Sequence, residues 1–130
     1  MSGAVADTSE WVEYLANRPA PAFRQWLESG GIILTPVVAL ELTSGARNRE
    51  EQFVIEDLLG DLRMHECTFH HWARAGELRR TLRAKGVSVS SLDAQVAQSA
   101  LDLDVPLLTR DAVFWKIAAH TSLKLTSPIT

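Results

Sequence analysis

The sequence has little of several residue types, and each shortage narrows the classes of protein that it can encode. A single cysteine, Cys67, stands among 130 residues, so no disulfide can form within the chain, as fits a reducing compartment. The longest apolar region, residues 32–42, is broken by polar residues and is too short to span a bilayer. No basic segment followed by an apolar stretch opens the chain, so we expect no signal peptide. These absences predict a cytoplasmic protein that does not contact membranes.

A surplus of positive charge is also missing. The chain has 13 lysine and arginine residues against 16 acidic residues, which gives a formal net charge of −3. Binding to nucleic acid through bulk positive charge is therefore disfavoured, and a polyanion would have to be held by local basic patches or by bound metal. A glycine-rich phosphate loop is absent as well, because Gly30-Gly31 precedes a predicted strand instead of following one.

Short apolar runs alternate with helical patterns along the chain. The runs that predict strands are residues 4–6, 32–34, 64–69 and 107–108, and residues 123–125 are expected to add an edge strand. The helical patterns cover residues 10–17, 21–28, 36–46, 50–62, 70–85, 91–103 and a last segment from residue 111. With no hairpin signal between the strands, this order predicts an α/β fold: one domain with a parallel sheet of four or five strands and helices on both faces.

Two aspartates occupy matching places at the ends of predicted strands. Asp7 ends the run 4–6, and Asp111 follows the run 107–108 with Thr109 between them. The carboxyl ends of parallel strands meet at one edge of an open α/β sheet, which is where ligands bind. Each aspartate alone could instead be only a helix cap, since aspartate is common at that position.

Two more acids fall on the inward faces of predicted helices. Glu41 shares a helical face with Val37 and Val38, and small apolar residues follow Asp93 at helical spacing. A surface position for Glu41 and a favourable contact of Asp93 with its helix dipole are the alternatives. Four acids gathered at one edge would repel one another unless a cation joined them. Mg²⁺ or Mn²⁺ is the expected cofactor, because hard divalent cations take carboxylate ligands and assist phosphoryl chemistry.

Four motifs in order carry a resemblance to a known family. They are Val5-Ala6-Asp7-Thr8-Ser9, Leu40-Glu41-Leu42, Ser91-Leu92-Asp93-Ala94-Gln95-Val96-Ala97 and Leu108-Thr109-Arg110-Asp111-Ala112-Val113-Phe114. Over about residues 4–125 the set resembles the PIN-domain ribonucleases, in particular the VapC toxins of prokaryotic toxin–antitoxin pairs. One departure is Val113, where many relatives have a second acid, and it puts the number of bound metals in question.

The resemblance implies a single PIN-like domain over residues 1–130 that acts as a metal-dependent endoribonuclease. The four acids would bind Mg²⁺ or Mn²⁺, and a metal-activated water would attack the phosphodiester of RNA, with tRNA or rRNA as the expected substrate. Thr8 and Thr109 would orient the carboxylates. The resemblance also implies a VapB-type antitoxin partner, whose tail would lie in a groove beside the active site, and a homodimer.

Several basic and aromatic residues are further candidates. Arg47, Arg79, Arg83 and Arg110 could hold RNA phosphates, although a solvated helix face is the favoured explanation for the arginines of the long helix. The tryptophans are expected mostly in the core, while Trp11 and Trp26 could also anchor a partner peptide.

A small group of histidines and a cysteine, His65, Cys67, His70 and His71, suggests a zinc site. Their spacing matches no standard zinc pattern and no second cluster completes it, so we expect structural or surface roles for them.

Two other functions fit parts of the sequence. A PIN-like RNA- or protein-binding module that has lost catalysis is supported by Val113 alone. A phospho-accepting receiver domain is a weaker alternative, because that fold needs a lysine after a late strand, and none occurs here before Lys116.

Overall fold

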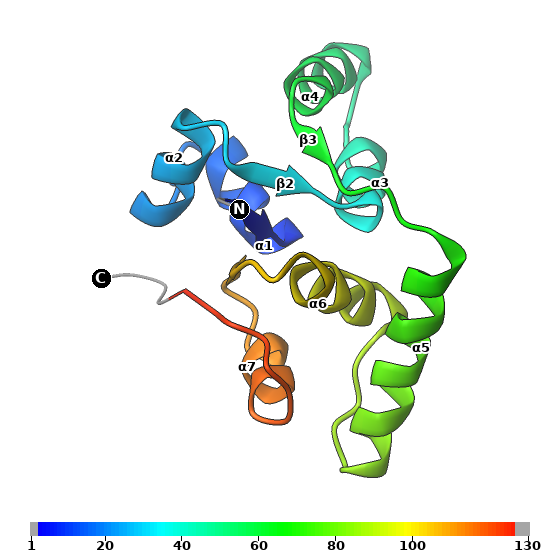
Figure 1. Ribbon diagram of the computed structural model, residues 1–130. Coiled ribbons are helices and arrows are strands. Elements are labelled where there is room, and N and C mark those ends of the chain that lie inside the picture. Colours follow the sequence, from blue (N-terminus) through cyan, green and yellow to red (C-terminus); the bar gives the residue numbers. More distant parts are fainter. Residues whose placement is uncertain (1–2, 127–130) are drawn as a thin grey trace.

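The computed structural model describes residues 3–126, and within them one parallel sheet organises the chain (Figure 1). Its strands are β1 (Ala4–Ala6), β2 (Ile32–Leu34), β3 (Arg63–Met64) and β4 (Leu107–Leu108), in the order β3-β2-β1-β4. The helices of the described residues are α1 (Thr8–Leu15), α2 (Pro21–Glu28), α3 (Pro36–Ser44), α4 (Arg49–Gly60), α5 (Phe69–Ala84), α6 (Ser91–Leu103) and α7 (Val113–Ala118). The predicted α/β fold, with helices flanking a parallel sheet, is confirmed.

The two edges of the sheet differ from the prediction. β3 is a strand for two exposed residues only, and residues 65–68 run on as irregular chain to α5. The predicted edge strand at residues 123–125 is reduced to a single bridge, in which Leu125 pairs in parallel with Leu107. Both edges carry too few paired residues for a regular strand, so apolar content alone overestimated their length.

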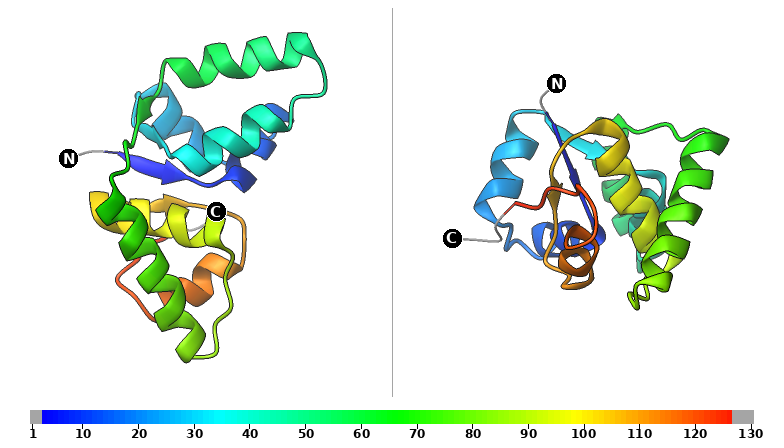
Figure 2. Two further views of the ribbon diagram at one scale, coloured as in Figure 1. Left: turned by 90° about the vertical axis from the view of Figure 1, so that its right-hand side faces the viewer. Right: turned by 60° about the horizontal axis from the view of Figure 1, so that its bottom comes forward.

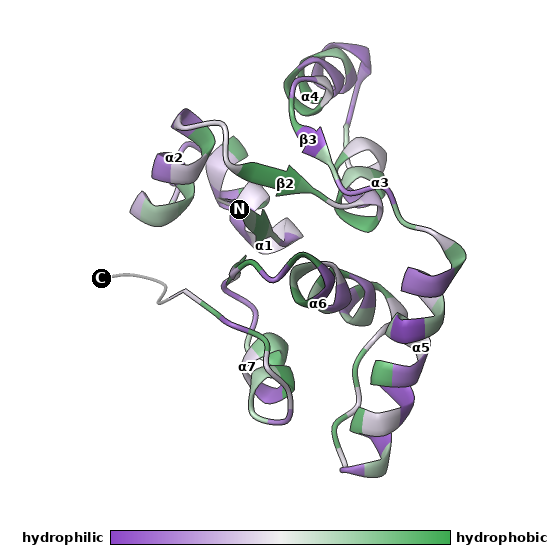
Figure 3. Ribbon diagram, in the orientation of Figure 1, coloured by the Kyte–Doolittle hydropathy of each residue, from purple (hydrophilic) through white to green (hydrophobic). Residues whose placement is uncertain are grey.

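The core lies around the two central strands and the helices packed on them. Every residue of β1 and β2 is buried, as expected for strands covered on both faces, and Figure 3 shows β2 as a hydrophobic strand between more polar helices. Trp11 packs edge-to-face on Phe23 with ring centroids 4.9 Å apart, which joins α1 to α2. Trp11 is therefore a core residue, which contradicts its alternative role as an anchor for a partner peptide.

Polar caps fix where the helices begin. Thr35 caps α3 by accepting a hydrogen bond from the Val38 amide, and Ser90 caps α6 by accepting one from the Asp93 amide. α1 begins two residues before the predicted residue 10, because the Asp7 carboxylate caps it by accepting a hydrogen bond from the Ser9 amide. None of the helices between residues 3 and 126 has the length and apolar character that crossing a membrane requires.

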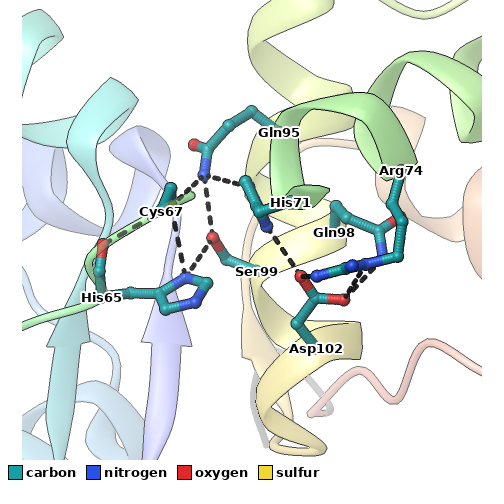
Figure 4. Close-up of polar contacts among 8 residues, drawn as sticks. All are labelled: His65, Cys67, His71, Arg74, Gln95, Gln98, Ser99 and Asp102. Atoms are coloured by element: carbon teal, nitrogen blue, oxygen red, sulfur yellow. Dashed lines mark hydrogen bonds and ion pairs between the residues drawn. The ribbon is translucent and has the colours of Figure 1, made fainter. Parts of the chain in front are cut away.

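α5 packs along α6, and the two helices lie side by side in both views of Figure 2. Asp102 on α6 joins them, accepting hydrogen bonds from Arg74 and His71 on α5 and from Gln98 one turn earlier on α6 (Figure 4). Burial alone would raise the pKa of Asp102, but these donors outweigh it and lower the pKa from an ordinary 3.8 to about 2.

The lowered pKa of Asp102 predicts a stability loss in acid. An acid whose pKa is depressed by folding stabilises the folded state above its unfolded pKa, and this contribution disappears as the pH falls from 3.8 to about 2. We expect Asp102→Asn to lower the melting temperature at neutral pH and to weaken its pH dependence across that interval. The neighbouring Asp104→Asn, whose partner Lys124 is exposed, should leave the wild-type profile nearly unchanged. Identical acid unfolding curves for wild type and Asp102→Asn, followed by circular dichroism, would contradict the assignment.

Candidate active site

The pairing of β1 with β4 creates the centre of the site. Ala6 pairs with Leu108, and the Asp7 amide donates to the Leu108 carbonyl at 3.0 Å. The next residues along the two strands, Asp7 and Thr109, therefore leave the sheet side by side, although 102 positions separate them in sequence. The Thr109 hydroxyl Oγ1 donates to Asp7 Oδ2 at 2.7 Å, which ties the ends of the two strands together through their side chains.

Asp7 is held on both of its carboxylate oxygens. Oδ1 accepts hydrogen bonds from the amide of Ser9 at 3.1 Å and from its hydroxyl, while Oδ2 accepts from Thr109. Only 5% of Asp7 is exposed. Burial raises the pKa of this carboxyl, the hydrogen bonds from Ser9 and Thr109 lower it in part, and the negative charge of Asp111 raises it further.

Glu41 approaches the site from α3. The Thr8 hydroxyl, in the first turn of α1, donates a short hydrogen bond to Glu41 Oε1. This contact orients the half-buried Glu41 side chain and joins α1 to α3, which also pack on each other. The prediction that Glu41 points inward from its helix therefore agrees with the structure.

Asp93 and Asp111 complete the group from the other side. Both line the same pocket as Glu41. Burial raises the pKa of Asp93, the hydrogen bond with Ser90 lowers it in part, and the negative charges of Asp111 and Glu41 raise it further. The Asp111 amide donates to Thr109 Oγ1 at 3.0 Å, and its carboxylate Oδ1 accepts from the Val113 amide at the same distance. Thr109 therefore positions both strand-end aspartates.

These acids surround one pocket of about 110 Å³. Its lining residues are Asp7, Thr8, Ser9, Glu41, Asp93, Val96, Asp111 and Phe114. Among residues 3–126, no three acids bring carboxylate oxygens within 4.8 Å of one another, so the four acids are spread around the pocket. A pocket lined by four carboxylates and no basic side chain fits a hard divalent cation with water in its remaining positions.

The structure gives Ser9 and Val113, which the sequence motifs contain without an assigned role, specific contacts at the site. Ser9 holds Asp7 through two hydrogen bonds, and the spacing Asp-x-Ser at a helix start is the pattern that could have indicated this. Val113, where an acid was missing, is not among the residues that line the pocket, and its contribution is the backbone amide bound to Asp111.

The four predicted RNA-binding arginines lie in three different surroundings, and only Arg79 and Arg83 share one. Arg47 forms an exposed ion pair with Glu51, N–O 2.7 Å. Arg110 forms an ion pair with the buried Glu10 of α1, with 3.7 Å between Arg110 Nε and Glu10 Oε1. Arg79 and Arg83 line a groove on α5 together with Trp72, Arg80 and residues of α6.

The histidine and cysteine group is only partly assembled. His65, Cys67 and His71 each bring one ligand atom within 4.8 Å of the others, whereas His70 is exposed and lies outside the group. None of these residues lines the pocket that contains the four acids, called the acid pocket below. Gln95 and Ser99 of α6 contact the group, and no pattern in the sequence predicts these contacts.

Thr109 offers a test of how the site is held. Thr109→Val removes the donor to Asp7 and the acceptor for the Asp111 amide, so buried polar groups lose their partners, and we expect a cost of about 1–3 kcal/mol in the free energy of unfolding. Thr109→Ser keeps the hydroxyl and should retain most of the stability. Equal stability of the valine and serine variants in urea denaturation would show that the hydroxyl does not hold the site.

Comparison with known proteins agrees with this architecture. The family model described as PIN domain matches residues 4–120. Among solved structures, the DNA-bound VapBC from Salmonella typhimurium is 19% identical with a TM-score of 0.82, over 97% of this chain and 98% of that chain. VapBC2 from Rickettsia felis, bound to a promoter DNA fragment, is 22% identical with a TM-score of 0.78, over 95% and 96%. VapBC-1 from nontypeable Haemophilus influenzae is 20% identical with a TM-score of 0.77, over 95% and 96%.

At these identities the structural likeness establishes the fold, and the family model extends over most of the chain. The order of the acids, their place at the carboxyl ends of β1 and β4, and the match over residues 4–120 lead to one conclusion. The chain belongs to the PIN domain family.

Proposed function

We propose that this protein is a metal-dependent endoribonuclease that acts as the toxin of a toxin–antitoxin pair. The observation that carries the proposal is the convergence of Asp7, Glu41, Asp93 and Asp111 on one pocket in a chain of the PIN domain family. The receiver-domain alternative does not fit this family. The expected location of such a toxin is the cytoplasm.

The same four acids would hold Mg²⁺ or Mn²⁺, because their donor set consists of carboxylate oxygens only. When bound there, such a cation polarises a phosphate oxygen and lowers the pKa of a water molecule. Burial raises the pKa of both Asp7 and Asp93, so these two carboxyls take up protons more readily than exposed acids when no positive charge is near. A bound cation would therefore balance the negative charge of these carboxylates and stabilise their ionised forms.

The hydroxyl residues keep the acids in place. Thr109 and Ser9 fix the two oxygens of Asp7, and Thr8 fixes one oxygen of Glu41. Side chains held in this way need not reorganise when a phosphodiester enters, which is the condition for strong electrostatic stabilisation in an active site.

RNA would reach the pocket along the groove on α5. Arg79, Arg80 and Arg83 line this groove with the partly exposed Trp72. Its α6 wall is formed by Ser91, two positions before Asp93, and by Ala94, directly after it. Arginine side chains bind phosphates, and an exposed tryptophan can stack on a base. We assign RNA contact to Arg79 and Arg83 ahead of Arg47 and Arg110, since the latter two pair with glutamates.

An antitoxin would occupy the groove between α1 and α4. Leu15 and Val54 line this space of about 460 Å³, and the neighbouring Phe53 is 72% exposed. Apolar side chains of this kind suit an amphipathic helix or an extended tail of a VapB-type partner. The likeness of the chain to the VapBC structures is the reason for proposing this partner. We also propose that the protein forms a homodimer.

The proposal predicts RNA cleavage that depends on both metal and Asp93. Purified protein free of any partner, incubated with a pool of total tRNA and rRNA, should give discrete fragments with Mg²⁺ or Mn²⁺ and none with EDTA. Asp93→Asn should lower the rate at least about 100-fold, since even groups that only support metal ligands cost about 10–100-fold. The exposed Asp57→Asn on α4 should cleave like wild type.

Two results would contradict the proposal. Fragments that persist in EDTA or in Asp93→Asn would place the activity outside this pocket. Absence of cleavage with either metal, for protein shown to be folded by circular dichroism, would favour the PIN-like binding module instead.

A further inference from the structure

We propose that His65, Cys67 and His71 form a binding site for Zn²⁺, separate from the acid pocket and placed where β3, α5 and α6 meet. The three ligand atoms lie within 4.8 Å of one another, and no other group of three histidine, cysteine or acidic side chains in the described residues is as close. The site is independent of the proposed nuclease function, because it shares no lining residue with the acid pocket.

The backbone delivers these residues from a short segment. His65 follows β3, and its amide donates to the Leu34 carbonyl of β2 at 2.8 Å, which anchors the histidine to the sheet. Cys67 lies in the irregular chain between β3 and α5, and its Sγ is 3.6 Å from His65 Nδ1. His71 follows in the first turn of α5 and is only 2% exposed.

Asp102 sets the tautomer of His71 that metal binding requires. The His71 Nδ1 hydrogen is donated to Asp102 Oδ2 at 2.8 Å, because the ionised carboxylate can only accept. The other ring nitrogen, Nε2, then presents its lone pair to the cluster (Figure 4). A carboxylate behind a histidine in this way is the usual support of a zinc ligand.

Gln95 marks the point on which the lone pairs converge. Its amide nitrogen Nε2 lies 3.0 Å from His71 Nε2, 3.7 Å from Cys67 Sγ and 2.8 Å from Ser99 Oγ. This amide donates at the place where a cation would be bound. Its other end, the buried Oε1, has no hydrogen-bond partner, so the amide is not fully satisfied by the protein alone.

The donor types select zinc over the cation of the acid pocket. Imidazole nitrogen and thiolate sulfur suit Zn²⁺, whereas Mg²⁺ and Mn²⁺ prefer oxygen. Binding would release the thiol proton of Cys67 to solvent as Sγ joins the metal. With three protein ligands, the fourth position would be taken by water or by the Ser99 hydroxyl, which already lies 2.8 Å from His65 Nδ1.

A bound Zn²⁺ would join the segment after β3 to α5. α5 packs on α6, and α6 carries Asp93 in its first turn. A ligand that binds only the folded chain stabilises it by mass action. We therefore expect Zn²⁺ to raise the melting temperature of the metal-stripped full chain, and Cys67→Ser to abolish that rise.

Cobalt(II) provides the direct test, because it replaces zinc and reports its ligands by absorption. Metal-stripped protein titrated with Co²⁺ should develop a thiolate-to-cobalt charge-transfer band in the near ultraviolet, and Zn²⁺ should remove it. Cys67→Ser should lose the band, and Asp102→Asn should weaken Co²⁺ binding about 10–100-fold. His70→Ala, an exposed neighbour, and Asp93→Asn, in the acid pocket, should both keep the band.

Three results would overturn the site. They are wild-type protein that shows neither the charge-transfer band nor a shift in melting temperature with Zn²⁺, a band of undiminished intensity in Cys67→Ser, and equal loss of the band in His70→Ala. The wild-type measurements need no variant to fold. They also do not depend on RNA cleavage, so failure of the nuclease proposal would leave this test unaffected.

Discussion

The parallel pairing of β1 with its neighbours is the constraint on which the site depends. Because β1 lies between β2 and β4, the backbone of Asp7 meets the end of β4, and Thr109 reaches the Asp7 carboxylate across 102 sequence positions. A two-residue strand such as β4 has little pairing of its own, so this side-chain hydrogen bond and the buried leucines of β4 hold the edge together. The sheet therefore determines where the first and last acids meet.

Repulsion among the four carboxylates is the second constraint, and the helices set the positions of two of them. α3 and α6 each bring one acid, Glu41 and Asp93, to the same pocket that receives Asp7 and Asp111. Hydroxyl donors satisfy some carboxylate oxygens, but none of them neutralises the combined negative charge. The arrangement costs stability in the absence of a cation, and such local cost is typical of sites whose geometry serves function.

Local patterns explain which features could be predicted from the sequence. The strands at residues 4–6, 32–34 and 107–108, and the inward acids, follow from apolar runs and helical spacing. Other features depend on tertiary contacts that no local pattern encodes. They are the ion pair of Arg110 with the buried Glu10 and the contact of His65 with Ser99 of α6. β3 was misjudged for a related reason, since its exposed residues are strand only because β2 pairs with them.

The central claim is that the four acids share one site for a hard divalent cation. The most direct measurement follows the free-ion signal of Mn²⁺ by electron paramagnetic resonance while metal-stripped protein is added. We expect the signal to fall with wild type and with Cys67→Ser alike, and the affinity of Asp93→Asn to be at least about tenfold weaker. Mn²⁺ bound equally well by Asp93→Asn, or no loss of the signal with folded wild type, would contradict a shared cation site in this pocket.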